Sequence, residues 1–284
     1  MDRQELFNPS RISQQPIPPE KRIIGLTDSV EYLPLIYGIK NNLIKHDFDL
    51  SFGTLLETAG RLREGELELG LISSYDYALK KETWQIVPNL CLSSANKIKH
   101  VQLFFKKGLT DITKVAIDKN AASEAILLKI LMREKFMISP EYFIMEPDLD
   151  KMLSQADSAL IIGERGLDYY KKHRNRLDLN EEWLDLTGLP FVYAFWAGRE
   201  ITVTTDDLHA IRSSFELGEK NLEKISKEYA HDRPHNWAFY HDFYTHNLSY
   251  TFSDTDQDGL NEFYNYAFFY GFTEFIPDLH FYKI

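Results

Sequence analysis

The chain has 284 residues and a formal net charge of -11, which arises from 43 acidic and 32 basic residues. Hydrophobic residues make up 44% and charged residues 26%, values that are typical of a globular protein and exclude a wholly disordered or collagen-like chain. A protein that binds nucleic acid usually carries a basic stripe. The sequence has none, so we expect no nucleic-acid partner.

Cysteine content and hydropathy limit the compartment and the kinds of site. Cys91 is the only cysteine, which excludes an intrachain disulfide and a zinc site built from cysteines. The first residues, MDRQELFNPS, lack the apolar stretch of a signal peptide, and no segment approaches the roughly 18 apolar residues that span a bilayer. We therefore expect a cytoplasmic protein with no membrane partner, while the sequence indicates no particular oligomeric state.

The expected elements begin after a tail. Residues 1–21 are expected to be poorly ordered, because QQPIPPE is rich in Pro and Gln. Short apolar runs predict strands at 22–26, 48–53, 68–74, 101–105, 114–118, 141–145, 158–163 and 191–197. Apolar residues at helical spacing predict helices at 32–40, 54–65, 121–136, 148–156, 205–230, 232–248 and 258–272. Alternating strands and helices predict a mostly parallel, helix-covered α/β architecture.

The stretch DTDQDGLNE (254–262) is similar to the start of a calcium-binding EF-hand loop. Asp254, Asp256 and Asp258 fall at positions 1, 3 and 5 of such a loop. Position 12 needs an acid that binds calcium through both oxygens, and here it is Asn265. An acidic first turn explains the same residues through the helix dipole, so we expect a helix start here and no metal.

Small hydroxyl residues gather where predicted strands end. These residues are Thr27, Ser29, Ser73, Ser74, Ser93, Ser94 and Ser123. In an open α/β sheet, ligands bind beyond the carboxyl ends of the strands, where hydroxyls and helix N-termini hold carboxylates. Helix capping explains the same residue types, so a ligand site and a capping role both stay open. The motifs of serine hydrolases, P-loops and dinucleotide-binding folds are absent, which makes those classes less favoured.

Four longer stretches together resemble a known family. They are LREGELELGLISSYDYA (62–78), VPNLCLSS (87–94), PDLDKMLSQADSALIIGERGL (147–167) and EEWLDLTGLPFVYAFWAGR (181–199). In this order they are similar to the chorismate dehydratases of the futalosine route to menaquinone. The resemblance runs from about Arg22 to about Phe272, which is nearly the whole chain.

The resemblance implies a fold that strand and helix spacing alone do not reveal. The family has a type II periplasmic-binding-protein-like fold, in which two α/β lobes flank a central cleft and the chain crosses between them twice. Transferred to this sequence, the two crossover strands lie near 101–107 and 191–197. The expected domains are lobe one, 22–104 with 196–284, and lobe two, 105–195.

The resemblance also implies a reaction and a ligand. The family removes water from chorismate and forms 3-[(1-carboxyvinyl)oxy]benzoate, and aromatisation of the ring supplies the driving force. No cofactor and no metal are implied, because the reaction exchanges no electrons with an acceptor. The expected partner is therefore a small anionic ligand such as chorismate, held by hydroxyls and backbone N–H groups of the loops.

Two loops locate the expected site residues. The family's first loop reads roughly Tyr-Leu-Asn-x-x-Pro, and the matching SVEYLP (29–34) puts Glu31 in place of the family's active-site Asn. The second reads roughly Asp-Ser/Thr-x-Ser-Arg-Thr-Ser, and DKNAASEA (118–125) has Ala121 and Ala122 in place of the Arg-Thr pair. We predict Glu31 as the catalytic residue. The predicted substrate-binding residues are Ser29, Ser93, Ser94, Lys119, Asn120, Ser123 and Glu164.

These substitutions act against a substrate with two carboxylates. A charged Glu31 repels a dianion by about a few kcal/mol at an effective dielectric near 20, and a lost hydroxyl donor costs about 1–3 kcal/mol. Glu31 has two possible roles, a protonated hydrogen-bond donor or the general base. Three functions stay open: a chorismate dehydratase-like lyase, a non-catalytic carboxylate-binding protein, and a lyase for a related ligand with one carboxylate fewer.

Overall fold

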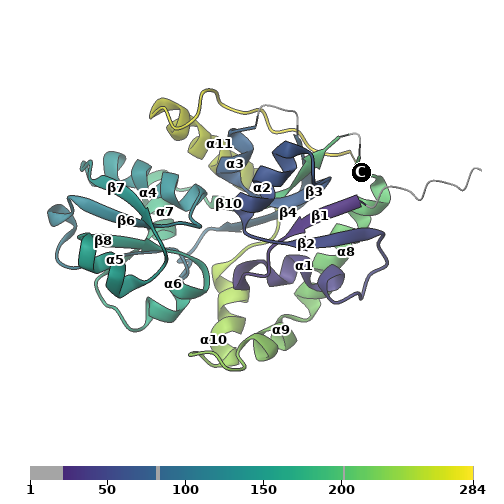
Figure 1. Ribbon diagram of the computed structural model, residues 1–284, viewed down its shortest axis with the longest axis horizontal. Coiled ribbons are helices and arrows are strands. Elements are labelled where there is room, and N and C mark those ends of the chain that lie inside the picture. Colours follow the sequence, from purple (N-terminus) through teal and green to yellow (C-terminus); the bar gives the residue numbers. More distant parts are fainter. Residues whose placement is uncertain (1–21, 81–83, 201, 284) are drawn as a thin grey trace, which may run out of the picture.

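The computed structural model describes residues 22–80, 84–200 and 202–283, so the tail expected at 1–21 lies outside the described residues. The strands form two separate five-stranded sheets. Each sheet and its helices form one lobe, and the two lobes lie side by side (Figure 1). This arrangement is the mixed α/β fold with two lobes that the family resemblance implies.

The sheet of lobe one is mixed. Its strand order is β2 (Phe48–Phe52), β1 (Arg22–Leu26), β3 (Leu69–Ser73), β10 (Phe191–Arg199) and β4 (Trp84–Ser94). β1 runs parallel to β2 and β3, whereas β10 runs antiparallel to β3 and β4. The parallel strands therefore end at one edge, and the loops that follow them lie together.

The sheet of lobe two repeats this pattern. Its order is β7 (Glu141–Met145), β6 (Lys114–Asp118), β8 (Ser158–Ile161), β5 (Gln102–Phe105) and β9 (Arg176–Asp178). β6 runs parallel to β7 and β8, and β5 runs antiparallel to β8 and β9. Lobe two therefore also presents the carboxyl ends of its parallel strands at one edge.

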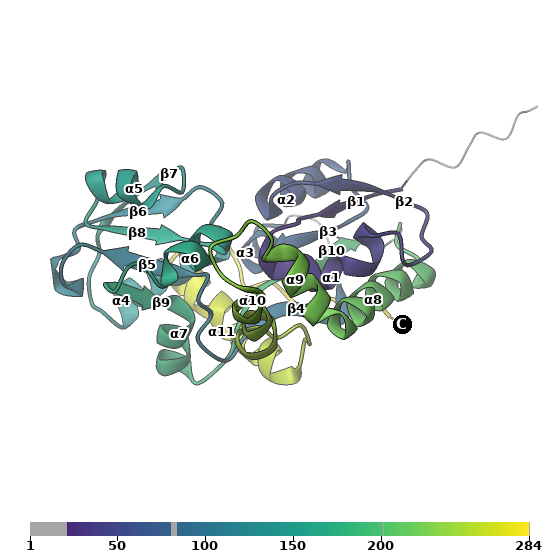
Figure 2. The same ribbon diagram turned by 90° about the horizontal axis from the view of Figure 1, so that it is seen from below.

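The helices cover the faces of both sheets (Figure 2). In lobe one they are α1 (Leu33–Lys40), α2 (Leu55–Glu64), α3 (Ser74–Ala78), α8 (Thr205–Lys220), α9 (Leu222–Tyr229), α10 (Trp237–Asp242) and α11 (Asp254–Phe269). In lobe two they are α4 (Ser123–Glu134), α5 (Leu149–Gln155), α6 (Gly163–Tyr170) and α7 (Leu179–Thr187). A 3-10 turn at Val30–Tyr32 precedes α1, and a π-helical turn at Phe243–Asn247 follows α10.

Local sequence explains several helix ends. Thr54 and Glu57 form a capping box at the start of α2, and Gly65 ends it in the left-handed conformation at φ +79°. The single helix expected at 205–230 is two helices, because the Asn221 side chain donates to the Leu217 carbonyl at 2.7 Å and caps the end of α8. The helix expected at 258–272 begins earlier, at Asp254, because Ser253 caps it.

The sheets also show where the chain passes between lobes. β5 already belongs to the sheet of lobe two at Gln102, and β10 belongs to the sheet of lobe one from Phe191. The two passages are therefore residues 95–101 and 188–190. They lie a few residues before the crossovers expected near 101–107 and 191–197, because each of those strands pairs entirely within one sheet.

Candidate active site

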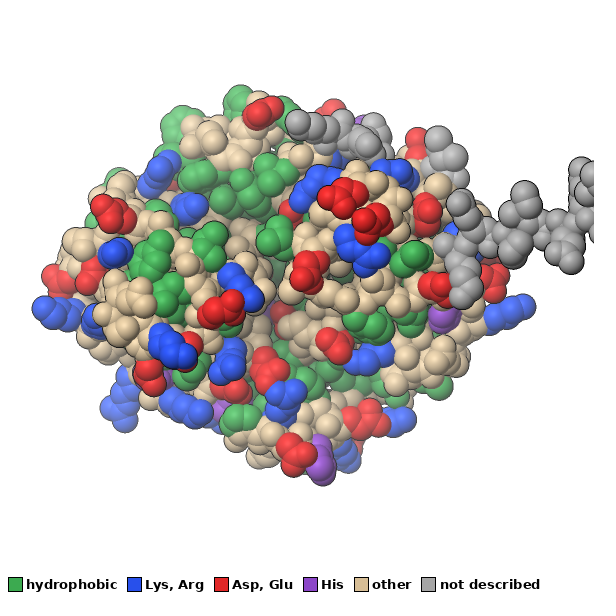
Figure 3. Space-filling view, in the orientation of Figure 1, with side chains coloured by type: hydrophobic (Ala, Val, Ile, Leu, Met, Phe, Trp, Pro, Cys, Tyr) green, Lys and Arg blue, Asp and Glu red, His purple; other side chains and the backbone are tan. Residues whose placement is uncertain are grey.

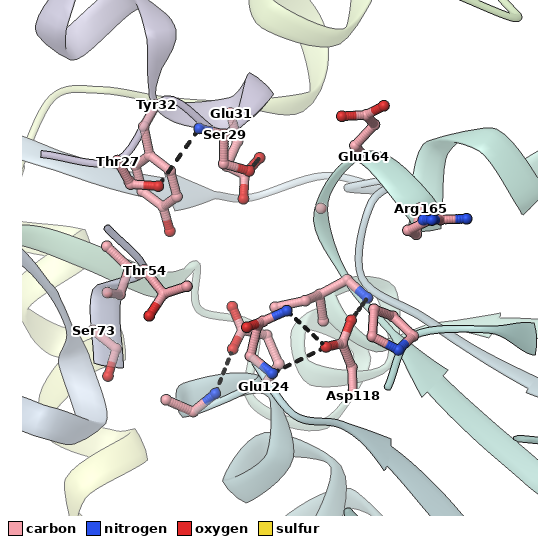
Figure 4. Close-up of a pocket in the computed structure, with 16 residues that line it drawn as sticks. Thr27, Ser29, Glu31, Tyr32, Thr54, Ser73, Asp118, Glu124, Glu164 and Arg165 are labelled. Atoms are coloured by element: carbon pink, nitrogen blue, oxygen red, sulfur yellow. Dashed lines mark hydrogen bonds between the residues drawn. The ribbon is translucent and has the colours of Figure 1, made fainter. Parts of the chain in front are cut away.

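A cavity of about 240 Å³ lies between the two lobes (Figure 4). From lobe one it is lined by Thr27, Ser29, Glu31, Tyr32, Thr54, Leu55 and Ser73. From lobe two it is lined by Asp118, Asn120, Ala122, Glu124, Pro147, Ile162, Gly163, Glu164 and Arg165. Most of these residues follow parallel strands, which is where ligands bind in open α/β sheets.

Glu31 lies in the 3-10 turn between β1 and α1 and is only 5% exposed. The Ser29 hydroxyl donates to its Oε2 at 2.6 Å. Two tyrosines hold the turn in place, because Tyr244 donates to the Val30 carbonyl and Tyr250 donates to the Glu31 carbonyl, both at 2.9 Å. The carboxylate of Glu31 is thus fixed at the cavity rather than free to swing into solvent.

The backbone of lobe two lies directly against this carboxylate. Gly163 begins α6 with a positive φ of +62°. A Cβ atom placed on it would be 3.5 Å from Ser29 Oγ and 3.7 Å from Glu31 Oε1. Glu31 therefore lies at the contact between the lobes, beside the first turn of α6, whose N–H groups and dipole favour an anion.

Asp118 ends β6 and binds neighbouring loops rather than facing the cavity as a free acid. Its Oδ1 accepts from the Asn120 backbone N–H at 3.0 Å and from the Asn120 side chain at 3.2 Å, and its Oδ2 accepts from the Ile162 N–H at 3.4 Å. Burial raises its pKa, and these hydrogen bonds oppose the rise. Asp118 joins the loops after β6 and β8, and it holds the side chain of Asn120.

Glu124 is the cavity carboxyl that sequence reasoning missed. It lies in the first turn of α4, is 6% exposed, and accepts from the Ala122 N–H at 3.2 Å. Burial is the main cause that raises its pKa to about 7, with further contributions from the charges of Glu31 and Asp118. The signal was present in DKNAASEA, but an acid in a first helical turn reads as an ordinary capping residue.

Tyr32 and Arg165 complete the polar lining. Burial, followed by the charges of Glu31 and Glu124, raises the pKa of Tyr32 well above its usual value, so its phenol stays protonated and can donate a hydrogen bond. Among the described residues that line the cavity, Arg165 is the one with a permanent positive charge. The cavity therefore combines several carboxyl groups with one cation.

Glu164 lines the cavity but forms an ion pair with Arg233. Arg233 belongs to the loop 230–236 of lobe one, between α9 and α10, which lies next to α6 (Figure 2). Both side chains of the pair are about one-third exposed, at 37% and 36%. The pair connects the lobes at the rim of the cavity and partly neutralises Glu164.

The structure brings together four predicted site residues and separates the others. Ser29, Glu31, Asn120 and Glu164 line the cavity. The other predicted site residues, Ser93, Ser94, Lys119 and Ser123, do not line it.

Packing and pairing explain these four positions. Ser93 and Ser94 are buried within β4, on the antiparallel edge of the sheet of lobe one. Lys119 points outward and pairs with Glu146 at 2.8 Å. Ser123 is buried beneath the cavity, where its hydroxyl lies 2.9 Å from Ser74 Oγ and accepts from the Tyr75 N–H at 3.0 Å.

The acidic stretch at 254–262 has a structural explanation. Ser253 and Asp256 form a capping box, in which Asp256 accepts from the Ser253 N–H at 2.9 Å. Within residues 22–80, 84–200 and 202–283, no group of three or more His, Cys, Asp or Glu side chains is arranged to hold a metal ion. No helix in the same ranges is both long and apolar enough to cross a bilayer.

The surface around the cleft carries both signs of charge. Figure 3 shows acidic and basic side chains interspersed over the face drawn there, without an extended basic area. Attraction of a polyanion such as nucleic acid needs a continuous basic surface. The face shown therefore favours a small ligand in the cavity over a polyanion on the outside.

Comparisons with solved structures establish the fold. A protein from Archaeoglobus fulgidus matches with a TM-score of 0.72 and 18% identity, covering 89% of this chain and 98% of that one. The alkanesulfonate-binding protein SsuA from Xanthomonas axonopodis pv. citri, solved with bound MOPS, matches with a TM-score of 0.64 and 14% identity over 92% and 95% of the two chains. The expected periplasmic-binding-protein-like fold is thus confirmed.

Comparisons of sequence establish the family. The chain is 28% identical over 221 residues to the chorismate dehydratase of Thermus thermophilus, which covers 71% of this chain and 80% of that protein. A family model described as menaquinone biosynthesis matches residues 23–268, nearly all of the described chain. The chain therefore belongs to the menaquinone biosynthesis family.

Proposed function

We propose that this protein is a chorismate dehydratase-like hydro-lyase of the futalosine route, acting in the cytoplasm. It would remove water from chorismate to form 3-[(1-carboxyvinyl)oxy]benzoate. The observation that supports the proposal is the cavity between the lobes, which is lined by Glu31, the residue that the family resemblance aligns with the active-site Asn. The similarity to the Thermus thermophilus enzyme supports the same reaction.

The lining offers a way to hold the two carboxylates of chorismate. Arg165 supplies a positive charge, and the first turn of α6 supplies N–H groups beside it. Thr27 and Thr54 add hydroxyls from lobe one, whereas the hydroxyl of Ser73 donates to Asp76 Oδ2 at 2.7 Å. Charge-assisted hydrogen bonds of this kind are about twice as strong as neutral ones, so they offset part of the repulsion from the acidic residues.

Glu31 is the proposed base of the reaction. The ring proton to be removed is activated because the ring carboxylate and the adjacent double bonds spread the developing charge. A carboxylate held at the cavity by Ser29 is correctly placed to accept such a proton. Loss of the neighbouring hydroxyl then gives an aromatic ring, which makes the step strongly favourable.

The second candidate is a non-catalytic binding protein for a small carboxylate. The acidic lining favours it, because Glu31, Asp118 and Glu124 share the cavity with Arg165 as the one cation among the described lining residues. Each charged carboxyl repels a dianion by about a few kcal/mol at a dielectric near 20. A ligand with one carboxylate fewer would meet less of this repulsion, and a lyase for such a ligand is the third candidate.

Incubation of the purified protein with chorismate distinguishes these candidates. The proposed function predicts a change in ring absorbance and a product lighter than chorismate by one water molecule in mass analysis. Glu31→Gln should abolish turnover and keep ligand binding, because the amide cannot accept the proton. Binding of chorismate without any loss of water would reject the lyase and favour the binding protein. If Glu31 only obstructs the ligand, Glu31→Asn should instead tighten binding.

A further inference from the structure

We infer that Glu124 is a second catalytic residue, the general acid that protonates the departing hydroxyl group while Glu31 accepts the ring proton. The inference rests on the proposed function and adds to it a partner for Glu31 from the opposite lobe. Neither the loops of the family resemblance nor the hydroxyl pattern pointed to Glu124. It is assigned here because of its position in the cavity.

Glu124 and Glu31 approach the cavity from opposite lobes. Dehydration breaks a C–H bond and a C–O bond on neighbouring ring carbons, so a base and an acid have to reach atoms that are one bond apart. Glu31 comes from lobe one and Glu124 from lobe two, and both line the same cavity of about 240 Å³ (Figure 4). Glu31 and Glu124 therefore approach a ligand in this cavity from opposite lobes.

The surroundings of Glu31 and Glu124 differ. Glu31 receives a hydrogen bond from the Ser29 hydroxyl at 2.6 Å, which orients its carboxyl group at the cavity. Glu124 is buried, and burial raises its pKa to about 7, so it holds a proton in a large fraction of molecules near neutral pH. A carboxyl group that burial keeps largely protonated near neutral pH is suited to the role of general acid.

The other polar groups that line the cavity are less suitable as the acid. Both oxygens of Asp118 accept hydrogen bonds from Asn120 and Ile162. Glu164 is paired with Arg233. The pKa of Tyr32 is raised well above its usual value, which makes the phenol a weak proton donor.

The step is balanced in atoms and electrons. Glu31 takes the ring proton, and the electron pair of that C–H bond enters the ring as a new double bond. The C–O bond of the neighbouring carbon breaks, and the oxygen leaves with the bonding pair and takes the proton of Glu124 to form water. One proton then passes from Glu31 to Glu124, directly or through water, and restores both groups. No oxidant or reductant is consumed.

The ionisation of Glu124 depends on groups from both lobes. Glu31 and Asp118 oppose its negative form, and the Ala122 N–H and the backbone of its own turn favour it. Tyr32 and Tyr193 also interact with its charge. Because an acid must hold its proton, the rate should fall as pH rises through the pKa of Glu124 in the free enzyme.

The test is the pH dependence of chorismate turnover in four proteins: wild type, Glu124→Gln, Glu124→Asp and the control Glu141→Gln. Glu141 is exposed at the start of β7, away from the cavity lining. Glu124→Gln should lower kcat about 10²–10⁴-fold, leave KM within severalfold, and remove the fall in kcat/KM at alkaline pH. Glu124→Asp should recover part of the rate and keep that fall, and Glu141→Gln should match wild type.

The outcomes separate this inference from the proposed function. If wild type releases no water from chorismate, the proposed function fails, and the acid role fails with it. If wild type is active and Glu124→Gln has the same kcat and the same fall in kcat/KM at alkaline pH, Glu124 is not the acid. Only the inference is then rejected. If Glu124→Gln is slower but its kcat/KM still falls at alkaline pH, the substitution acts through the structure, and the acid role of Glu124 is likewise rejected.

Discussion

The two lobes meet along two sides that differ in chemistry. On the packed side, Phe191 of β10 lies between Trp183 of α7 and Phe263 of α11, with ring centroids 5.5 and 4.9 Å away. The hydroxyls of Ser74 and Ser123 lie 2.9 Å apart beneath the cavity on the same side. These contacts are buried and continuous with the apolar core, so they fix how the lobes are oriented.

On the cavity side, the lobes also touch at the rim through partly exposed polar groups. Glu164 pairs with Arg233, and the ring Nε2 of His235 lies 2.9 Å from the Leu167 carbonyl. Exposed ion pairs stabilise a fold by only about 0–1 kcal/mol. The packed side therefore holds the lobes together through buried contacts, whereas the exposed ion pair at the rim of the cavity adds little to stability.

The largest expected effect on stability comes from a substitution that pushes α6 away from the passage at residues 95–101. A Cβ atom on Gly166 would overlap the His100 carbonyl. Gly166→Ala should therefore destabilise the protein by about 3 kcal/mol or more, because backbone on both sides has to move. Chemical denaturation measures this change. In the control, Gly60→Ala, the new methyl has no atom within 4 Å and should stabilise α2 slightly. Equal stability of both variants would show that α6 is not fixed against the passage.

The second largest effect is the pH dependence of stability that the buried carboxyl group of Glu124 causes. The folded-state pKa of Glu124 is about 7, above the ordinary 4.5. Between these pH values the folded protein binds a proton that the unfolded chain has released. The stability due to this group is therefore complete below pH 4.5, falls as pH rises, and is lost above the folded pKa of about 7.

The size of this loss is about 3 kcal/mol, from 1.36 kcal/mol for each unit of pKa difference. Glu124→Gln cannot titrate, so its free energy of unfolding should fall by less than that of wild type between pH 4.5 and pH 8. Denaturation at both pH values measures the difference, with Glu141→Gln as the control that follows wild type. Identical pH dependence in all three proteins would mean that Glu124 is not desolvated.

Part of this fold and site could be predicted from the sequence. β6 and β7 were predicted residue for residue, because each is an apolar run bounded by turns. β4 was not among the strands expected from apolar runs, because Pro88 and Asn89 interrupt its pattern, and Asn89 has a positive φ of 63°. Its pairing with β10 joins segments that are about one hundred residues apart in the sequence. The local pattern of apolar residues does not predict such long-range contacts.

The site shows the same limit. Ser29 and Glu31 could be located because both lie in one short loop that matches the family. Glu124 could not be recognised, because an acid in the first turn of a helix is common, and only the folded structure shows that this one is buried at the cavity. Ser123 was expected at the ligand for its residue type, yet packing places it beneath the cavity against Ser74.

A third effect tests the polar contact of the packed side. Ser123→Ala removes the hydroxyl that accepts from the Tyr75 N–H, while Ser74 keeps its bond to the Val192 carbonyl at 2.8 Å. A buried donor left without a partner costs about 1–3 kcal/mol, which thermal unfolding detects. The exposed Ser154, which donates to Lys151 within its own helix, provides the control Ser154→Ala with little change. No difference between the two variants would show that this hydroxyl contact does not hold the lobes.

The smallest expected effect on stability comes from the cavity side. Arg233→Ala breaks the ion pair with Glu164, whose side chains are about one-third exposed, so stability should change by less than about 1 kcal/mol. Binding should change more, because Glu164 then faces an anionic ligand with its charge uncompensated. We expect chorismate affinity to fall severalfold at low salt and to recover partly at high salt, since salt screens an exposed charge. Arg212→Ala, which breaks an exposed pair with Glu216 on α8, should leave affinity unchanged. If Arg233→Ala instead lowered the unfolding temperature as much as Ser123→Ala, the cavity side would hold the lobes as firmly as the packed side, and the two sides would not differ as described.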